Sequence, residues 1–258
     1  EEAKQELRSM IFDKKFGESS SKVVIEEFLD GIELSCFVLT DGLNYKILPF
    51  AKDYKKIGKA DTGLNTGGMG AISPVVFLDD VFLEKIEERI IKPTINGIIK
   101  ENMEYMGIVF IGLIKVNEDP YVIEYNVRMG DPETEVVFPR IKNDLLELFN
   151  SMGSKEFANI DLIVDKRHAA TVIMVSGGYP ISYEKNKIIT GLENITDSII
   201  FHAGTKKVDN VFLTNGGRVL AITSLAKNYK QAVDLSYNQI EKISFDKAYF
   251  RKDIGFDL

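Results

Sequence analysis

The stretch Val122–Glu135, VIEYNVRMGDPETE, gathers more polar chemistry than any other part of the chain. It begins with the alternation of a β-strand, in which successive side chains point to opposite faces of a sheet. The polar side chains of Glu124, Asn126 and Arg128 are therefore expected to share one face. The apolar side chains expected on the other face are Ile123, Tyr125 and Val127.

The polar row has the chemistry of a metal and phosphate site. A carboxylate and an amide oxygen two residues apart are hard ligands, and Mg²⁺ takes one or two such groups while water and phosphates fill its other positions. Arg128 adds a planar donor fork for phosphate or carboxylate oxygens. The alternative is the solvated face of an edge strand. The Gly-Asp-Pro turn that follows favours a site, because it places Asp131 at the end of the row, while Glu133 and Thr134 are expected to cap the next helix.

A second candidate lies in residues 51–74, a glycine-rich stretch without apolar periodicity. A loop of this length in a compact domain is usually functional, and the alternative is a flexible surface excursion. Glycines let backbone amides approach an anion or a small substrate closely. The spacing does not match the phosphate loop G-x-x-x-x-G-K-[ST] or the dinucleotide motif G-x-G-x-x-G, so neither of those folds is supported.

Periodicity predicts a mixed α+β (α/β) fold in two domains, residues 1–155 and 156–258. Helices are predicted over 1–12, over 79–100 with a division near Pro93, after Asp144, and over 229–240. Strands are predicted over 23–29, 33–40 and 45–50, in GIVFIGLIKV and PYVIEYNV, and in the C-terminal runs AATVIMV, SIIFHA and RVLAITS. The run VVIEEFL (23–29) alternates poorly, which predicts a strand buried on both faces.

Composition excludes several functional classes. The net charge is −7 without a basic block, which argues against nucleic-acid and membrane-surface partners. The single Cys36 cannot form an internal disulfide and is expected to be buried, and the two histidines are too far apart in sequence to suggest zinc or nucleophilic catalysis. A cytoplasmic location and a Mg-nucleotide site fit these observations best.

Seven segments together closely resemble the glycinamide ribonucleotide synthetase (phosphoribosylamine-glycine ligase) family, in the family's order and over nearly the whole chain. They are VVIEEFLDGIELS, DTGLNTGGMGAISP, VIEYNVRMGDPETE, HAATVIMVSGGYP, FHAGTK, TNGGRVLAIT and FRKDIG. The resemblance implies the C-terminal part of an ATP-grasp fold, followed by a small β-rich C-terminal domain. It also implies ATP with Mg²⁺ or Mn²⁺, and the substrates glycine and 5-phosphoribosylamine, joined through a glycyl phosphate in purine biosynthesis.

The resemblance also assigns roles to residues. The adenine and ribose of ATP are expected at Glu26, Glu27, Phe28, Leu29 and Glu33. The metal ligands are expected to be Glu124 and Asn126, with Arg128 and Asp131 beside the transferring phosphoryl group. The substrate-side residues are expected to be Lys55, Asp61, Thr62, Gly63, Asn65, Thr66, Gly67 and Gly68. The chain departs from the family at DYKK (53–56), where DHKR is usual, and at Glu135, where Gln is usual.

The family's N-terminal domain and its lysine-bearing first ATP-grasp strands have no match in this sequence. The chain is therefore expected to be the C-terminal half to two-thirds of such an enzyme and to be inactive alone. Two alternatives stay open at this point: another ATP-grasp ligase or carboxylase subunit, and a non-catalytic nucleotide-binding module.

Overall fold

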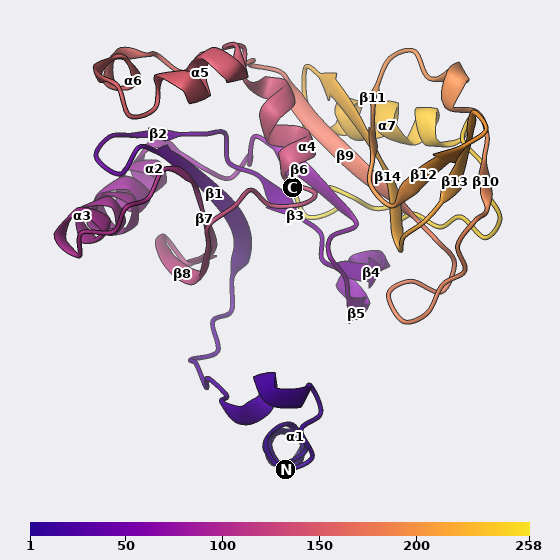
Figure 1. The fold of residues 1–258 in the computed structure, drawn as a ribbon, viewed down its shortest axis with the longest axis horizontal. Helices are drawn as coiled ribbons and strands as arrows, with labels where there is room; N and C mark the ends of the chain where they lie inside the picture. The colour runs from indigo at the N-terminus through magenta and orange to yellow at the C-terminus, as the bar shows by residue number, and fades with distance from the viewer. The chain divides into compact units, whose positions relative to one another are not determined.

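The first sheet is built on two long apolar strands, β1 (Ile32–Thr40) and β7 (Gly107–Val116). A computed structural model describes all residues from 1 to 258, and in it these strands pair antiparallel along their whole length. The short β2 (Tyr45–Ile47) and β8 (Asp119–Asn126) flank them, in the order β2-β1-β7-β8 (Figure 1). The predicted strands in this region are confirmed.

Helices cover one face of this sheet. The predicted helix over 79–100 consists of α2 (Asp80–Ile86), a π-helical turn (Glu87–Ile91) and α3 (Lys92–Lys100). The division falls just before Pro93, as the sequence predicts, because a proline cannot donate the backbone hydrogen bond that continues a helix. The apolar side of these helices packs against β1 and β7, where Cys36 is fully buried.

The second sheet has the order β11-β14-β9-β6-β3. Its centre is β9 (His168–Val175) and β14 (Arg218–Ala226), with β11 (Ile199–His202) at one edge and β6 (Gly70–Ser73) and β3 (Lys52–Asp53) on the other side. The helix α7 (Tyr229–Ile240) packs on β9 and β14 and buries its predicted apolar face in their core.

The expectation that residues 51–74 form one long loop is wrong. They contain β3, a small hairpin of β4 (Lys56–Gly58) and β5 (Thr62–Asn65), and β6. Two to four residues are too few to show a period, and the partner of β6 is β9, about a hundred residues away. Sequence periodicity therefore could not reveal these strands.

The remaining elements are short. They are the three-stranded sheet β10 (Ile188–Ile189), β13 (Val211–Thr214) and β12 (Thr205–Val208), the helices α4 (Thr134–Val137), α5 (Leu145–Ser151) and α6 (Lys155–Asn159), and four 3-10 turns: Gly17–Ser21, Lys59–Asp61, Phe138–Arg140 and Leu192–Asn194. Asp144 caps α5 by accepting from the backbone N–H groups of Leu146 and Glu147, as predicted.

The α+β class is confirmed. No helix is long and apolar enough to cross a bilayer.

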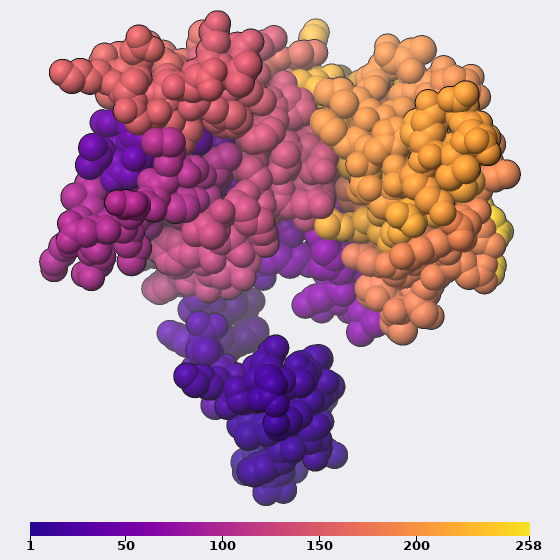
Figure 2. All heavy atoms as spheres, in the orientation of Figure 1, coloured from indigo at the N-terminus to yellow at the C-terminus, as the bar shows by residue number.

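The chain consists of two compact units, Glu1–Asp30 and Gly31–Leu258. Within the larger unit, the orange and yellow C-terminal residues gather on one side and the magenta and pink residues on the other (Figure 2). The two sides share the five-stranded sheet, because β6 pairs with β9. The predicted domain boundary at residue 155 stays a prediction, and this sheet continues across it.

The smaller unit contains the predicted first helix, α1 (Glu2–Ile11), and the 3-10 turn Gly17–Ser21. The prediction of a buried strand over 23–29 is wrong. These residues pair with no strand, and Val24, Ile25 and Phe28 are 80%, 79% and 88% exposed. A strand needs a partner for its backbone groups, and its apolar sequence alone does not supply one.

Candidate active site

A cavity of about 570 Å³ opens in the larger unit between the four-stranded sheet and the five-stranded sheet. The strand β1 supplies Glu33 and Ser35, and the end of β8 supplies Glu124. The turn after β8, residues 128–133, forms another wall. The remaining polar side chains come from the second sheet and its loops, namely Asp53, Lys55, Thr66 and Arg218.

The polar row at the end of β8 is present. The Asn126 Nδ2 donates to Glu124 Oε1 at 3.1 Å, and Arg128 Nη2 donates to Asn126 Oδ1 at 3.3 Å. The expected alternation fails at one position, because a bulge sets Gly112 opposite Glu124 and the next residue opposite Val122. Ile123 is the extra residue, and it lines the cavity beside Glu124.

An arginine joins the glycine loop to the turn after β8. Arg218 Nη1 lies 2.9 Å from Asp131 Oδ1 and donates to the carbonyl oxygens of Gly67 at 2.7 Å and Asp131 at 2.9 Å. The Gly67 N–H in turn donates to the Tyr179 hydroxyl at 2.9 Å. A Cβ on Gly67 would lie 2.9 Å from the Arg218 guanidinium, so glycine makes this close approach possible.

Two acids lie on the buried wall of the cavity. The Glu133 side chain accepts from the Ser35 hydroxyl at 2.8 Å and is only 4% exposed. It makes no hydrogen bond to the N-terminus of α4, so the predicted capping role is wrong. Burial and the charge of Asp53 raise the pKa of Glu133 to about 7, and burial together with Glu33 raises the pKa of Asp53. The two acids therefore hold protons near neutral pH more readily than exposed carboxyls do.

Lys55 is a cation whose charge acts on both acids. Its ammonium group is paired with Glu33 at the mouth of the cavity. Burial acts to lower the pKa of Lys55, but Asp53 and Glu33 together outweigh it and raise the pKa above its ordinary value. Lys55 is therefore charged at neutral pH and can neutralise a phosphate or carboxylate that enters the cavity.

The donor set suits a hard divalent cation bound together with a nucleotide. No three His, Cys, Asp or Glu side chains gather into a group that could hold a metal ion without other ligands. Glu124 lines the cavity, and the Asn126 amide adjoins it with its oxygen accepting from Arg128. A carboxylate and an amide oxygen are hard ligands, and Mg²⁺ typically takes one or two protein groups and completes its shell with water and phosphate oxygens. Glu124 and Asn126 therefore fit a Mg²⁺ or Mn²⁺ ion bound together with a nucleotide, as the sequence predicts.

The other predicted residues occupy different places. A second cavity of about 470 Å³ shares Glu33 and Lys55 with the first and is also lined by Asp61 and Asn65. The residues Thr62 and Gly63 are exposed in β5, and Gly68 is buried. The predicted adenine segment, Glu26 to Leu29, belongs to the smaller unit, and its role stays a prediction.

Sequence reasoning assigned no site role to Ser35, Asp53 and Arg218, and it gave Glu133 a different role. For Arg218 a signal exists, since a lone arginine follows the double-glycine turn of TNGGRV, where a strand begins. Asp53 lies in the tetrapeptide DYKK, in which the predicted site residue is Lys55. Ser35 and Glu133 carry no local signal, because their pairing joins positions 98 residues apart.

Two family models, both of one synthetase, match this chain. The phosphoribosylglycinamide synthetase ATP-grasp (A) domain matches residues 1–134, and the C domain of the same synthetase matches residues 169–257. A phosphoribosylamine-glycine ligase from Fusobacterium nucleatum is 45% identical over 260 residues, which cover 98% of this chain and 61% of that protein. The bifunctional purine biosynthetic protein PUR2,5 of Pichia angusta is 44% identical over 99% of this chain and 33% of its own length.

Solved structures point to the same family. A phosphoribosylamine-glycine ligase from Thermotoga maritima has a TM-score of 0.79 and 35% identity, covering 88% of this chain and 56% of that one. A biotin carboxylase domain of a thermophilic 2-oxoglutarate carboxylase, 14% identical with a TM-score of 0.64, shares the fold alone. The chain spans about three-fifths of the length of the single-function relatives it matches. It has the ATP-grasp fold and belongs to the phosphoribosylglycinamide synthetase family.

Proposed function

We propose that the protein containing this chain joins glycine to 5-phosphoribosylamine at the expense of ATP. The γ-phosphoryl group of ATP passes to a glycine carboxylate oxygen, and ADP leaves. The amine then attacks the acyl carbon, the phosphate leaves, and the amine gives up a proton. The products are glycinamide ribonucleotide, ADP and phosphate, and the step belongs to purine biosynthesis.

One observation carries this proposal: the cavity brings together the Glu124 carboxylate, which Asn126 adjoins, the cations Lys55, Arg128 and Arg218, and part of the glycine loop. Glu124 and Asn126 are the residues that would hold Mg²⁺ or Mn²⁺, which when bound offsets the negative charge of the nucleotide phosphates. Arg128 and Lys55 present cations to the same space. Phosphoryl transfer depends mainly on alignment and charge neutralisation, which these groups supply.

The remaining groups orient the acceptor. Arg218 fixes the Gly67 carbonyl and the Asp131 side chain relative to each other, so the backbone near Gly67 can meet a small carboxylate substrate at a constant position. The buried Glu133 and Asp53 are candidates to receive the proton that the amine releases, since both lie on the cavity wall.

The expected partners are the two small substrates, with neither nucleic acid nor membrane involved. The chain is acidic overall, with a net charge of −7, which gives a polyanion no attractive surface field. The reaction is expected in the cytoplasm, a reducing compartment that suits the single buried thiol of Cys36.

The test is a ligase assay on the complete gene product with ATP, glycine and freshly generated 5-phosphoribosylamine. Formation of glycinamide ribonucleotide with one ADP per product supports the proposal. ATP binding without turnover would favour a nucleotide-binding module. Turnover with another carboxylate or amine in place of these substrates would favour a different ATP-grasp ligase.

A further inference from the structure

The C-terminal segment, residues 250–258, contains neither helix nor strand but holds the β4–β5 hairpin. Its anchor is α7, where the Tyr237 hydroxyl donates to the Arg251 carbonyl at 3.0 Å and accepts from the Ile254 N–H at 3.0 Å. Just before the segment, the Tyr249 hydroxyl donates to the carbonyl of Ile57 in β4 at 2.8 Å. The segment therefore bridges the C-terminal helix and a hairpin about 190 residues earlier.

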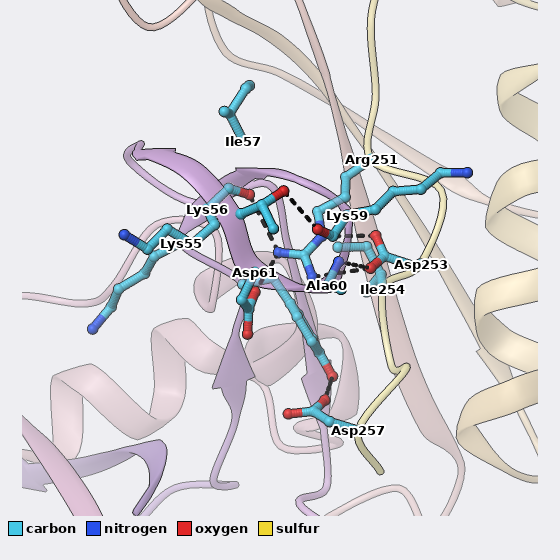
Figure 3. Close-up of polar contacts among 12 residues, drawn as sticks. Lys55, Lys56, Ile57, Lys59, Ala60, Asp61, Arg251, Asp253, Ile254 and Asp257 are labelled. Carbon is cyan, nitrogen blue, oxygen red and sulfur yellow. Dashed lines mark hydrogen bonds and ion pairs between the residues drawn. The ribbon is translucent and has the colours of Figure 1, made fainter. Parts of the chain in front are cut away.

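Arg251 is the central contact of this bridge (Figure 3). Its side chain is completely buried. Its guanidinium donates to Asp61 Oδ1 at 2.6 Å and to the Lys56 carbonyl at 3.2 Å, both on the hairpin. It also donates twice to Asp253, at 2.8 and 3.2 Å. The rings of Tyr54 and Phe256 lie 5.3 and 5.4 Å from it. A buried cation with this many partners is held in one orientation.

The bridge supports an unfavourable turn at the tip of the hairpin. Ala60 and Asp61 both have left-handed backbone conformations, with φ of 49° and 51°, which non-glycine residues rarely adopt. The Asp253 side chain accepts from the Ala60 N–H at 2.6 Å, while Arg251 binds the Asp61 side chain. Inside the turn, the Thr62 hydroxyl and N–H donate to the Lys59 carbonyl. The contacts of Arg251 and Asp253 are the ones that fix the turn to the C-terminal segment.

The hairpin forms part of the second cavity, of about 470 Å³. Asp61 and Lys56 line it from the hairpin, and Asp257 lines it from the C-terminal segment, where it is paired with Lys52 at 3.0 Å. The cavity continues into the main one through Glu33, Asp53 and Lys55, which line both. Seven of its ten lining residues are charged, and both signs are present, which suits a ligand that carries an amine, hydroxyl groups and an anion.

We propose that Arg251 and Asp253 are positioning residues that hold the Ala60–Asp61 turn so that Asp61 faces the second cavity, where the phosphorylated amino-sugar substrate binds. The identity of the ligand rests on the proposed function, whereas the positioning of the turn does not. One oxygen of Asp61 is fixed by Arg251, so the other is available to accept from the substrate's hydroxyl or amine groups.

The first experiment is hydrogen–deuterium exchange on the complete gene product, comparing Arg251→Lys and Asp253→Asn with the wild type. Arg251→Lys keeps the positive charge but loses the planar guanidinium that donates to several partners at once. Asp253→Asn keeps Arg251 and removes the negative charge that pairs with it. Both should exchange at least 10-fold faster over residues 56–66 while β9, β14 and α7 keep their protection. Lys252→Met removes the neighbouring cation, which is exposed, and is the control with unchanged exchange. Unchanged exchange over residues 56–66 in both variants overturns the positioning role.

The second experiment measures steady-state kinetics of the same variants. The KM for 5-phosphoribosylamine should rise about 10-fold, with the KM for ATP within 2-fold of the wild type. Equal losses for both substrates, or a loss in kcat alone, would overturn the assignment of the second cavity to the amino sugar. If the wild-type product shows no ligase activity, the proposed function fails and the exchange experiment alone decides whether Arg251 positions the turn.

Discussion

At the scale of single residues, Glu124 and Tyr125 offer a contrast between neighbours. Glu124 lines the main cavity and accepts from Asn126, while the Tyr125 hydroxyl lies 3.0 Å from the hydroxyl of Thr94 on α3. We predict that Glu124→Gln in the complete gene product lowers kcat on the order of 100-fold, because the amide lacks the charge that binds a divalent cation. Tyr125→Phe should keep activity and lose less than about 1 kcal/mol of stability.

The measurement is kcat against Mg²⁺ concentration for both variants, beside their melting temperatures. Asn126→Ala should resemble Glu124→Gln, with partial rescue at high Mg²⁺. Near-normal turnover in Glu124→Gln, or a larger loss in Tyr125→Phe, would show that the polar row of β8 is only a solvated face.

Glu133 gives a pH dependence with a definite sign. Its pKa is raised to about 7 in the folded protein from an ordinary value of 4.5, so the folded state binds more protons between these pH values than the unfolded state. The free energy of unfolding should therefore fall as pH rises from about 4.5 to about 7. Glu133→Gln removes this contribution and should improve stability at pH 8 relative to pH 5, on the order of 1–3 kcal/mol.

Urea unfolding of wild type and variant between pH 5 and 8 checks this. The groups that face Glu133 are Asp53, whose raised pKa contributes a slope of the same sign, Lys55, whose charge opposes the shift, and the Ser35 hydroxyl. Ser35→Ala removes a hydrogen bond that favours the charged form of Glu133, so it should steepen the fall in stability. If the free energy of unfolding changes with pH in the same way in wild type and Glu133→Gln, the raised pKa of Glu133 is contradicted.

At the scale of elements, the glycine loop packs closely at Gly67 and Gly68, and Gly68 leaves less room for a side chain. Its φ is +114°, and a Cβ there would lie 2.3 Å from Pro132 Cδ in the turn after β8. Gly68→Ala should cost about 1–3 kcal/mol and also lower activity, because the alanine forces the loop and the Asp131 turn apart. Gly97→Ala in α3 is a matched control, since nothing lies within 4 Å of its Cβ.

Thermal or urea unfolding of both variants compares the two positions. Gly97→Ala should leave the protein as stable as before, or raise its stability by up to about 1 kcal/mol, through the higher helix propensity of alanine. An equal loss of stability at both positions would mean that the close approach of Gly68 to Pro132 is not what limits the loop.

At the scale of the whole molecule, the residues between Ser151 and Arg167 are the expected site of a proteolytic cut, because 153–156 are exposed. We predict that the two pieces stay together after cleavage. The strand β6 remains paired with β9 across the cut, and Arg140, before the cut, donates to the carbonyls of Asp165 and Arg167. Limited proteolysis followed by native size-exclusion chromatography should show one peak containing both pieces. Separation without denaturant would support two independent domains divided near residue 155.

Sequence alone determined the features that repeat along the chain or concentrate in one stretch. The long apolar strands β1, β7, β9 and β14 and the helix α7 follow from periodicity, because each is long enough to show its period. The polar row of β8 follows from strand alternation, apart from Ile123, where a bulge adds a residue. The family follows from seven motifs in order, since together they specify more than any one of them.

Tertiary structure alone decided what depends on a distant partner. The short strands β3 and β6 exist because a long-range ladder completes them, and residues 23–29 lack strand structure because no partner pairs with them. The proton affinity of Glu133 comes from burial beside Asp53, and the place of Asp61 comes from Arg251, 190 residues away. Such pairings leave no periodic trace in the sequence, because the physical interaction exists only once the chain has folded and brought the two positions together.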